Sequence, residues 1–236
     1  ETAFITTDAN IMGEPVAVED AEECIFGMVL FNDWSARDIQ KWEYVPLGPF
    51  LAKNFASSIS PWIVTLDALQ PFKCASPEQH PKPLPYLQQT GNHAYDINLQ
   101  VAIQPENSVE TILSNSNFKY MYWTMSQQLA HHTINGCRVN SGDMMGSGTI
   151  SGPTPDSFGS MLELSWGGQN PIKMNDGSER KFINDNDTVI IRGYCQNDQI
   201  RIGATVNLLS DWSLRTRIGK PNPKVFIPFS DSIAFV

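Results

Sequence analysis

The chain has 236 residues, 41% of them hydrophobic, and a formal net charge of -9 at pH 7. A chain of this length forms one large or two small domains and is long enough to bury a hydrophobic core. With only 16 Lys and Arg residues, the composition argues against a nucleic-acid-binding surface, which requires a basic patch. No uncharged apolar stretch of about eighteen residues or more is present, so no membrane-spanning helix is expected, and no secretory leader is apparent.

The first residue is Glu1, and the strand-like alternation of residues 1–5 begins there without any lead-in. We therefore expect the chain to be a fragment of a longer protein. The four cysteines, at positions 24, 74, 137 and 195, are irregularly spaced and form no Cys-x-x-Cys pair, which argues against the usual zinc and redox motifs. We interpret them as reduced core thiols of a cytoplasmic protein.

Short apolar or alternating runs bounded by Gly, Pro, Asn or Asp predict β-strands. In chain order these runs cover residues 2–7, 24–32, 62–68, 95–103, 160–166, 188–195 and 200–208. Helical spacing of apolar residues is rarer and predicts helices at 17–23, 35–42 and 117–131. Prolines make residues 71–85 a predicted surface loop. The sequence therefore predicts a mixed, β-rich (α+β) fold with few short helices.

The most informative segment covers residues 31–40. An apolar run ends there at Asp33, and a short polar helix is predicted to follow at once. A carboxylate fixed at a strand end suits a hard divalent cation, which takes oxygen ligands. Ser35 or Asp33 is a candidate cap for the helix, and Arg37 and Gln40 would share one helix face. From these residues alone, a capped helix with a solvated polar face fits equally well.

Residues 27–40, followed by Trp-Glu-Tyr-Val-Pro-Leu-Gly-Pro-Phe at 42–50, resemble the fumarylacetoacetate hydrolase family. The Asn-Asp-x-Ser-Ala-Arg-Asp core at 32–38 is shared by the whole superfamily, whereas the 42–50 segment is more specific. The match continues at residues 59–62, 81–87, 121–125, 148–152 and 157–166. The resemblance implies a β-roll in which residues 1–203 are a C-terminal catalytic domain without its N-terminal part. Residues 204–236 resemble nothing in the family and form a tail of unknown role.

Glu1 and Asp33 are the candidate metal ligands, because carboxylate oxygens suit Mg2+ or Ca2+ and the scattered His and Cys residues offer no transition-metal spacing. The resemblance adds the backbone carbonyl of Lys53 and the hydroxyl of Ser57, where the family more often has Thr. It also implies further metal ligands upstream of this chain. Without the resemblance, an aspartate at a strand end is more often structural than catalytic.

Lys53, Arg37 and Gln40 are candidate catalytic residues that would stabilise negative charge developing on a carbonyl oxygen or a leaving enolate. The alternative for Lys53 is a lysine whose stem covers apolar surface while its ammonium reaches solvent. By resemblance, Gln40, Tyr44 and Thr149 occupy substrate-contacting positions. The alternative for Tyr44 is ordinary packing next to the neighbouring tryptophan.

Glu163 lies in an apolar segment predicted to be a strand, and burying a carboxylate there is costly unless it is paired. In the family this glutamate holds a catalytic histidine, which is expected upstream of this chain. His131 and His132 at the end of the predicted helix are instead expected to interact with its dipole. We expect Glu163 on the same wall of the site as Asp33, Lys53 and Thr149.

The resemblance implies hydrolysis of a carbon-carbon bond in 4-fumarylacetoacetate, giving fumarate and acetoacetate, in tyrosine and phenylalanine catabolism, by a homodimer. This chain alone is expected to be weakly active or inactive. One alternative is another enzyme of the superfamily, an acylpyruvate hydrolase or an oxaloacetate decarboxylase. The other is a non-catalytic truncated variant that acts as an interaction partner.

Overall fold

The computed structural model describes residues 1–209 and 233–234, and within them antiparallel sheet dominates. The first sheet has the order β10-β1-β2-β4, with β5 also paired to β2. Its strands are β1 (Thr2–Thr6), β2 (Ile25–Asp33), β4 (Ser57–Ile59), β5 (Val64–Thr65) and β10 (Met144–Gly146). The predicted β-rich fold with few short helices is confirmed.

The second sheet has the order β14-β13-β8-β9. Its strands are β8 (Asn98–Gln104), β9 (Thr111–Asn117), β13 (Thr188–Gln196) and β14 (Arg201–Leu209). Three further strand pairs are β6 (Lys73–Cys74) with β7 (Ala94–Tyr95), β11 (Ile172–Lys173) with β12 (Glu179–Arg180), and β3 (Ser35–Ala36) with β15 (Ile233–Ala234). The tail predicted for 204–236 begins inside β14, and its residues 210–232 and 235–236 lie outside the described residues.

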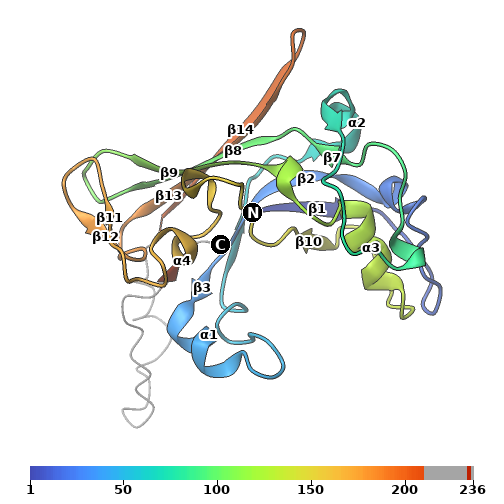
Figure 1. Ribbon diagram of the computed structural model, residues 1–236, viewed down its shortest axis with the longest axis horizontal. Helices are drawn as coiled ribbons and strands as arrows, with labels where there is room; N and C mark the ends of the chain where they lie inside the picture. The colour runs from blue at the N-terminus through green and yellow to red at the C-terminus, as the bar shows by residue number, and fades with distance from the viewer. Residues whose placement is uncertain (210–232, 235–236) are drawn as a thin grey trace.

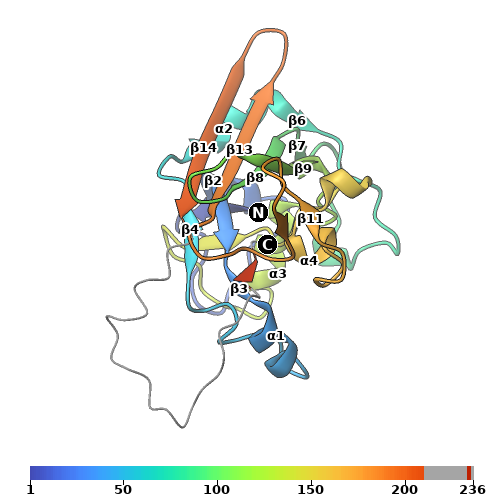
Figure 2. The ribbon, with the colours of Figure 1, turned by 90° about the vertical axis from the view of Figure 1, so that its left-hand side faces the viewer.

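The α-helices are α1 (Arg37–Glu43), α2 (Leu66–Leu69), α3 (Met125–Thr133) and α4 (Met161–Leu164). Short 3-10 turns occur at η1 (Ala21–Cys24), η2 (Gln70–Phe72), η3 (Pro85–Leu87), η4 (Phe118–Tyr120) and η5 (Pro155–Ser157). Figures 1 and 2 show the β13-β14 hairpin and α1 projecting from opposite ends of the molecule. None of the described helices is long and apolar enough to cross a membrane.

The main hydrophobic core lies between the two sheets and includes Phe4 and Leu30 from the first sheet and Ile103 and Ile191 from the second. Gly193 on β13 marks the closest approach, because a Cβ atom there would lie 2.7 Å from Cδ2 of Leu30. The sheets pack this tightly only because glycine has no side chain. The core thus holds β2 rigidly, and the functional segment starts where β2 ends.

The structure corrects several predicted elements. The strand predicted at 160–166 is helix α4, and the strand predicted at 62–68 is β5 followed by α2. The helix predicted at 117–131 starts only at Met125, where Thr124 and Gln127 form a reciprocal capping box, and the one predicted at 17–23 is reduced to η1. A capping side chain fixes where a helix begins more strictly than apolar spacing does.

The caps predicted for the helix after β2 were also wrong. Ser35 and its neighbour Ala36 are extended as β3, so the helix begins at Arg37 with no side-chain cap. The Ser35 hydroxyl donates instead to the Asp33 carbonyl oxygen at 3.0 Å. Asp38 supplies the local acceptor, since its carboxylate accepts from the backbone N–H of Ile39 at 2.8 Å.

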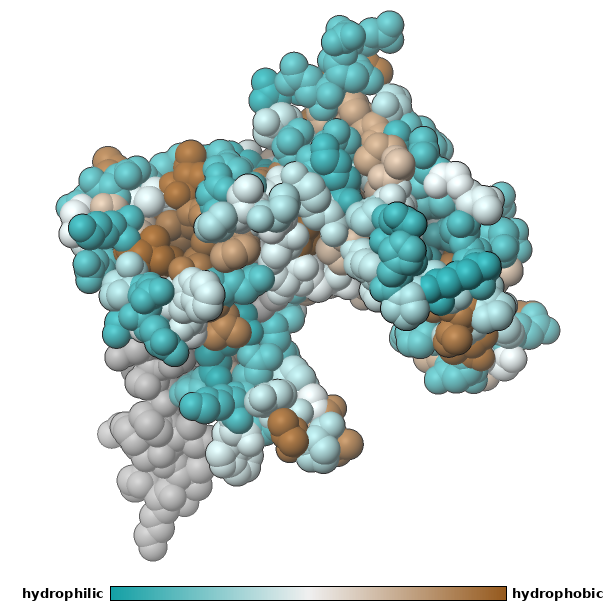
Figure 3. Space-filling view, viewed as in Figure 1, coloured by the Kyte–Doolittle hydropathy of each residue, from teal (hydrophilic) through white to brown (hydrophobic). Residues whose placement is uncertain are grey.

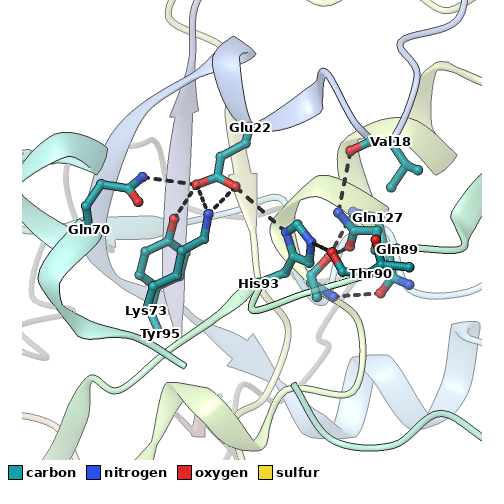
Figure 4. A network of polar contacts seen from close by, with 10 residues as sticks. Val18, Glu22, Gln70, Lys73, Gln89, Thr90, His93, Tyr95 and Gln127 are labelled. Atoms are coloured by element: carbon teal, nitrogen blue, oxygen red, sulfur yellow. Dashed lines mark hydrogen bonds and ion pairs between the residues drawn. The ribbon is translucent and has the colours of Figure 1, made fainter. Parts of the chain in front are cut away.

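A polar network around Glu22 fastens η1, η2, β6 and β7 together (Figure 4). Its carboxylate accepts from Gln70, from the Lys73 ammonium at 2.6 Å and from the Tyr95 hydroxyl at 2.8 Å. Burial and the hydrogen bond to Glu22 raise the pKa of the Tyr95 hydroxyl. His93 completes the group, with Nδ1 3.8 Å from the carboxylate. The network therefore anchors the first part of the loop predicted at 71–85. That part contains η2 and β6 and is not irregular.

All four cysteines are free. Only Cys195 is buried, where burial raises the pKa of its thiol to about 12. The prediction of core thiols is therefore confirmed for Cys195, whereas the other three are half-buried.

Candidate active site

The site begins where β2 ends, at Asp33. The Asp33 carboxylate forms an ion pair with the Lys53 ammonium at 3.0 Å, and both side chains are about three-quarters buried, with exposed fractions of 25% and 21%. Lys53 reaches this position because the backbone N–H of Ala36 donates to the carbonyl oxygen of Ala52 at 3.0 Å. Ser57 on β4 is the residue directly opposite Asp33, and such cross-strand pairs have adjacent side chains. Two residues predicted from the sequence thus flank the Asp33 carboxylate.

The loop between α1 and Lys53 is held by Glu43 at the end of α1. Its carboxylate accepts from the backbone N–H groups of Phe50 at 2.7 Å, Leu51 at 3.2 Å and Ala52 at 2.8 Å. These hydrogen bonds lower the pKa of Glu43. One carboxylate therefore closes the loop that carries Tyr44 at its start and leads to Lys53 at its end.

Glu1 lies on the same side of the sheet as Asp33. Burial raises the pKa of the Glu1 carboxyl, and the negative charge of Asp33 raises it further, while the chain's amino group and Lys53 act in the opposite direction. A hydrogen bond from the Gly148 backbone also reaches this carboxylate. Two acidic groups that repel each other in a half-buried position favour a cation between them.

The donor set around these carboxylates fits a hard divalent cation in part. Glu1, Asp33 and the Ser57 hydroxyl are all oxygen donors, the kind that Mg2+ and Ca2+ take. The fully buried Asn32 amide next to Asp33 has no hydrogen-bond partner. Within residues 1–209 and 233–234, no three His, Cys, Asp or Glu side chains form a group that could hold a metal. The described residues thus supply a share of the six to eight ligands of Ca2+ and not the whole set.

Arg37, at the start of α1, lies near the carboxylates of Asp33 and Glu1 and also near that of Glu163. Its guanidinium donates to the Gln40 side-chain oxygen at 2.7 Å, so the two residues share one face of α1. Burial lowers the pKa of Arg37, against the influence of three nearby carboxylates, those of Asp33, Glu163 and Glu1. Its Nε is buried without a hydrogen-bond partner. Because Gln40 accepts with its oxygen, its amide N–H groups remain available as donors.

Glu163 lies on helix α4 and not on a strand, which corrects the sequence-based prediction. Its carboxylate accepts from the Ser151 hydroxyl at 2.8 and 2.9 Å and from the Ser160 hydroxyl at 2.9 Å. Ser151 accepts in turn from the backbone N–H of Gly159 at 3.0 Å, and Ser160 from that of Glu163 at 3.3 Å. Each hydroxyl therefore donates its proton to the carboxylate. These hydrogen bonds offset the free-energy cost of removing the charge from water.

Thr149 lies in the segment that joins the two sides. The residue before it, Gly148, contacts the Glu1 carboxylate, and Ser151 two residues later holds Glu163. Thr149 itself is exposed and packs beside Gly159, where a Cβ atom would lie 2.8 Å from its methyl group. The segment 148–151 thus contacts Glu1 at its start and Glu163 at its end, with Thr149 between them.

An open cleft of about 600 Å³ lies between α1, α4 and the segment after β12. Its lining residues are Arg37, Asp38, Gln40, Lys41, Tyr44, Leu162, Gly167 and Phe182. In Figure 3, α1 and the loop after it stand out from the body, with apolar residues at their free end. The exposed apolar residues of that loop include Val45, Leu47, Phe50 and Leu51. Three residues predicted from the sequence, Arg37, Gln40 and Tyr44, therefore line one cleft. The other predicted residues, Glu1, Asp33, Lys53, Ser57, Thr149 and Glu163, are not among its lining residues.

A model for the C-terminal domain of fumarylacetoacetate (FAA) hydrolase matches residues 5–215 of this chain. The chain belongs to the fumarylacetoacetate hydrolase family. It is 58% identical to fumarylacetoacetase of Homo sapiens and 52% identical to that of Arabidopsis thaliana, each over 204 residues. These matches cover 86% of this chain and 49% and 48% of the two relatives, so the chain spans about half their length.

Solved structures agree with this fold. A yeast protein of the fumarylacetoacetate hydrolase family, ynq8, has a TM-score of 0.51 at 13% identity, over 89% of this chain and 65% of that chain. A putative HpcE protein from Mycobacterium smegmatis has a TM-score of 0.50 at 18% identity, over 89% of this chain and 56% of that chain. The family model also extends beyond position 203, where the predicted tail begins.

Several residues at this candidate site were not predicted from the sequence. Ser160 had a signal, because Ser three positions before Glu is typical of a helix start. Ser151 lies in the family-like segment 148–152, which was a signal for it, whereas Phe182 had none because its neighbours in space are distant in sequence. Tyr44 lines the cleft and is 50% exposed, and the neighbouring Trp42 is 87% exposed. The alternative of ordinary packing between Tyr44 and Trp42 is therefore weak.

Proposed function

We propose that the protein containing this chain hydrolyses the carbon-carbon bond of 4-fumarylacetoacetate to give fumarate and acetoacetate. The observation that carries the proposal is the convergence of Arg37, Gln40 and Tyr44 on one cleft, with Arg37 also in the field of Asp33 and Glu163. The identity to proteins named fumarylacetoacetase supports this choice over other hydrolases and decarboxylases of the family.

Glu1, Asp33 and Ser57 would hold Mg2+ or Ca2+ together with ligands from outside the described residues. When bound, such a cation polarises carbonyl oxygens as a Lewis acid. The role of the Lys53 backbone carbonyl as a further ligand remains a prediction. The Lys53 ammonium already neutralises Asp33 at 3.0 Å, which supports a cationic requirement at this position.

The reaction adds the hydroxyl of water to the fumaryl carbonyl carbon, and the bond to the acetoacetate carbon then breaks. The electron pair of that bond leaves as a carbanion, which takes up a proton to give acetoacetate. Arg37, Lys53 and the amide of Gln40 would stabilise the negative charge that develops on oxygen. Tyr44 and Thr149 are assigned to substrate contact.

Glu163 is proposed to orient the base that activates water, as a buried acid orients the histidine of a hydrolytic triad. Within the described residues, its hydrogen-bond partners are the hydroxyls of Ser151 and Ser160, and none of the four histidines contacts it. A carboxylate has about four acceptor positions. It therefore retains capacity for a base supplied from elsewhere in the protein.

We also propose that the protein is a cytoplasmic homodimer that binds neither nucleic acid nor membrane. Free cysteines agree with a reducing compartment, and a net charge of -9 disfavours nucleic acid. Exposed apolar side chains such as Leu47, at 80%, and Trp62, at 73%, offer surface to a second copy.

The test is to incubate the protein containing this chain with 4-fumarylacetoacetate and follow the products by proton NMR. Equal amounts of fumarate and acetoacetate are expected, with formation abolished by a chelator and restored by Mg2+ or Ca2+. Preferential cleavage of an acylpyruvate would instead support the first alternative enzyme. Cleavage of neither substrate would contradict a hydrolase role and leave the non-catalytic alternative.

A further inference from the structure

A second cavity adjoins the catalytic cleft and is not used by the proposed reaction. It has a volume of about 480 Å³ and is lined by Gly167, Gly168, Pro171, Glu179, Lys181, Phe182 and Asn184. Two of these residues, Gly167 and Phe182, also line the 600 Å³ cleft that contains Arg37. The two spaces therefore meet at these residues. Both ribbon views place α4 beside the β11-β12 hairpin, as this arrangement requires (Figures 1 and 2).

The Phe182 ring is held at this boundary by a close contact with a turn. A Cβ atom on Gly168 would lie 2.9 Å from Cε2 of the ring, so only glycine allows the ring this position. The turn contains three successive residues with positive φ, namely Trp166 at 50°, Gly167 at 66° and Gly168 at 82°. A tryptophan in this region is uncommon, and such strain concentrates at functional sites.

Each of the two spaces is lined by at least one cationic side chain. The cleft presents the cations Arg37 and Lys41, with Asp38 as its one acidic lining residue. The second cavity presents Lys181, with Glu179 as its acidic lining residue. Between them, Phe182 is the apolar side chain that lines both spaces. A ligand with a carboxylate at each end and an apolar middle would meet a cation in each space if this side chain were absent.

We propose that Phe182 sets the length of the acyl group that the site accepts. The inference rests on the proposed function and adds the residue that selects the substrate. With the ring in place, the cleft accepts a short unsaturated acyl group with one terminal carboxylate, such as the four-carbon fumaryl unit, whose apolar carbons pack against the ring. Without the ring the two cavities join, and the second carboxylate of a longer ligand reaches Lys181.

The test compares binding of two probes by calorimetry in the presence of Mg2+, namely fumarate and trans,trans-muconate, which is longer by one carbon-carbon double bond. Wild type is expected to prefer fumarate. Phe182→Ala should bind muconate more tightly relative to fumarate, so that the ratio of the muconate to the fumarate dissociation constant falls by about tenfold or more, the size of effect that a change in pocket size produces. The ratio for Phe182→Leu, which keeps an apolar side chain, should lie between those of wild type and Phe182→Ala. A partly unfolded variant would lose affinity for both probes and leave the ratio unchanged.

Phe26→Ala is the matched control, since Phe26 is 49% exposed at the start of β2 and lines neither cavity. It should keep the wild-type ratio. An unchanged ratio in a Phe182→Ala protein that itself still binds fumarate overturns the role of Phe182 and leaves the proposed function standing. If wild type binds neither fumarate nor muconate, the proposed function itself fails.

Discussion

Arg37 is half-buried near the carboxylates of Asp33, Glu163 and Glu1. Burial alone would disfavour its charge, and the three acidic groups keep that charge in place. A fixed cation of this kind stabilises an oxyanion without reorganisation during the reaction. At the residue scale, the site is a set of opposite charges arranged around one guanidinium.

Asp33→Asn keeps the size of the side chain and removes its charge. We expect it to lower the affinity of the protein for Mg2+ and Ca2+ by at least about tenfold, since even residues behind the ligands have effects of that size. Calorimetric titration of the protein with each cation measures this affinity directly. Asp156→Asn, at an exposed position on η5, is the control and should bind as wild type does. Unchanged affinity in Asp33→Asn would remove this residue from the metal site.

Ser151→Ala removes the hydroxyl that donates to both oxygens of Glu163. Hydrogen bonds to charged groups contribute about 1.5–3 kcal/mol, so we expect kcat to fall roughly tenfold with KM nearly constant. Ser151→Thr should retain activity, because it keeps the hydroxyl. The matched control is Ser116→Ala, whose hydroxyl donates to the carbonyl of Ile150, the residue before Ser151. Equal kcat values for the two alanine variants would show that the hydroxyl does not position Glu163.

At the element scale, β1, β2, β8, β13 and β14 were predictable from apolar or alternating runs, whereas β4, β9 and β10 of the same two sheets were not predicted. The structure of segment 160–166 was not predicted correctly, because Met-Leu-Glu-Leu fits a strand and a helical turn equally well. The Ser160 cap decides for the helix by accepting from the backbone N–H of Glu163. The residues of the site on α1 were predictable from a family motif, whereas Phe182 is placed by long-range packing.

The Glu22 network makes an element-scale prediction about pH. Burial opposes ionisation of Glu22, but hydrogen bonds from Lys73, Tyr95 and Gln70 outweigh it, so the pKa of Glu22 is lowered from its usual value of 4.5. Its stabilising contribution is therefore present above about pH 4.5 and is lost as the pH falls through the lowered pKa. Glu22→Gln should cost about 1–3 kcal/mol of unfolding free energy at pH 7 and much less near pH 3. Urea titrations at both pH values measure this, and an equal loss at both would contradict it.

At the scale of the whole molecule, the candidate site lies between α1, α4 and the end of β2. The exposed apolar loop after α1 and Trp62 offer surface that a second copy can cover. We expect light scattering at tens of micromolar to report a dimer. Leu47→Asp, in the middle of that loop, should shift the mass toward the monomer and leave the far-UV circular dichroism spectrum unchanged, with a lower melting temperature because the partner no longer stabilises the folded state. A wild-type monomer under these conditions would contradict the dimer.

Glu163 is proposed to orient the base of a hydrolase. The most direct test is the turnover of 4-fumarylacetoacetate by the protein containing this chain, wild type against Glu163→Gln. The change keeps the side-chain shape and removes the charge that Ser151 and Ser160 hold. We predict an unchanged fold, a KM within about threefold and a kcat lower by roughly a hundredfold or more, as when a catalytic histidine loses its acidic partner. A Glu163→Gln protein with wild-type kcat would contradict the account.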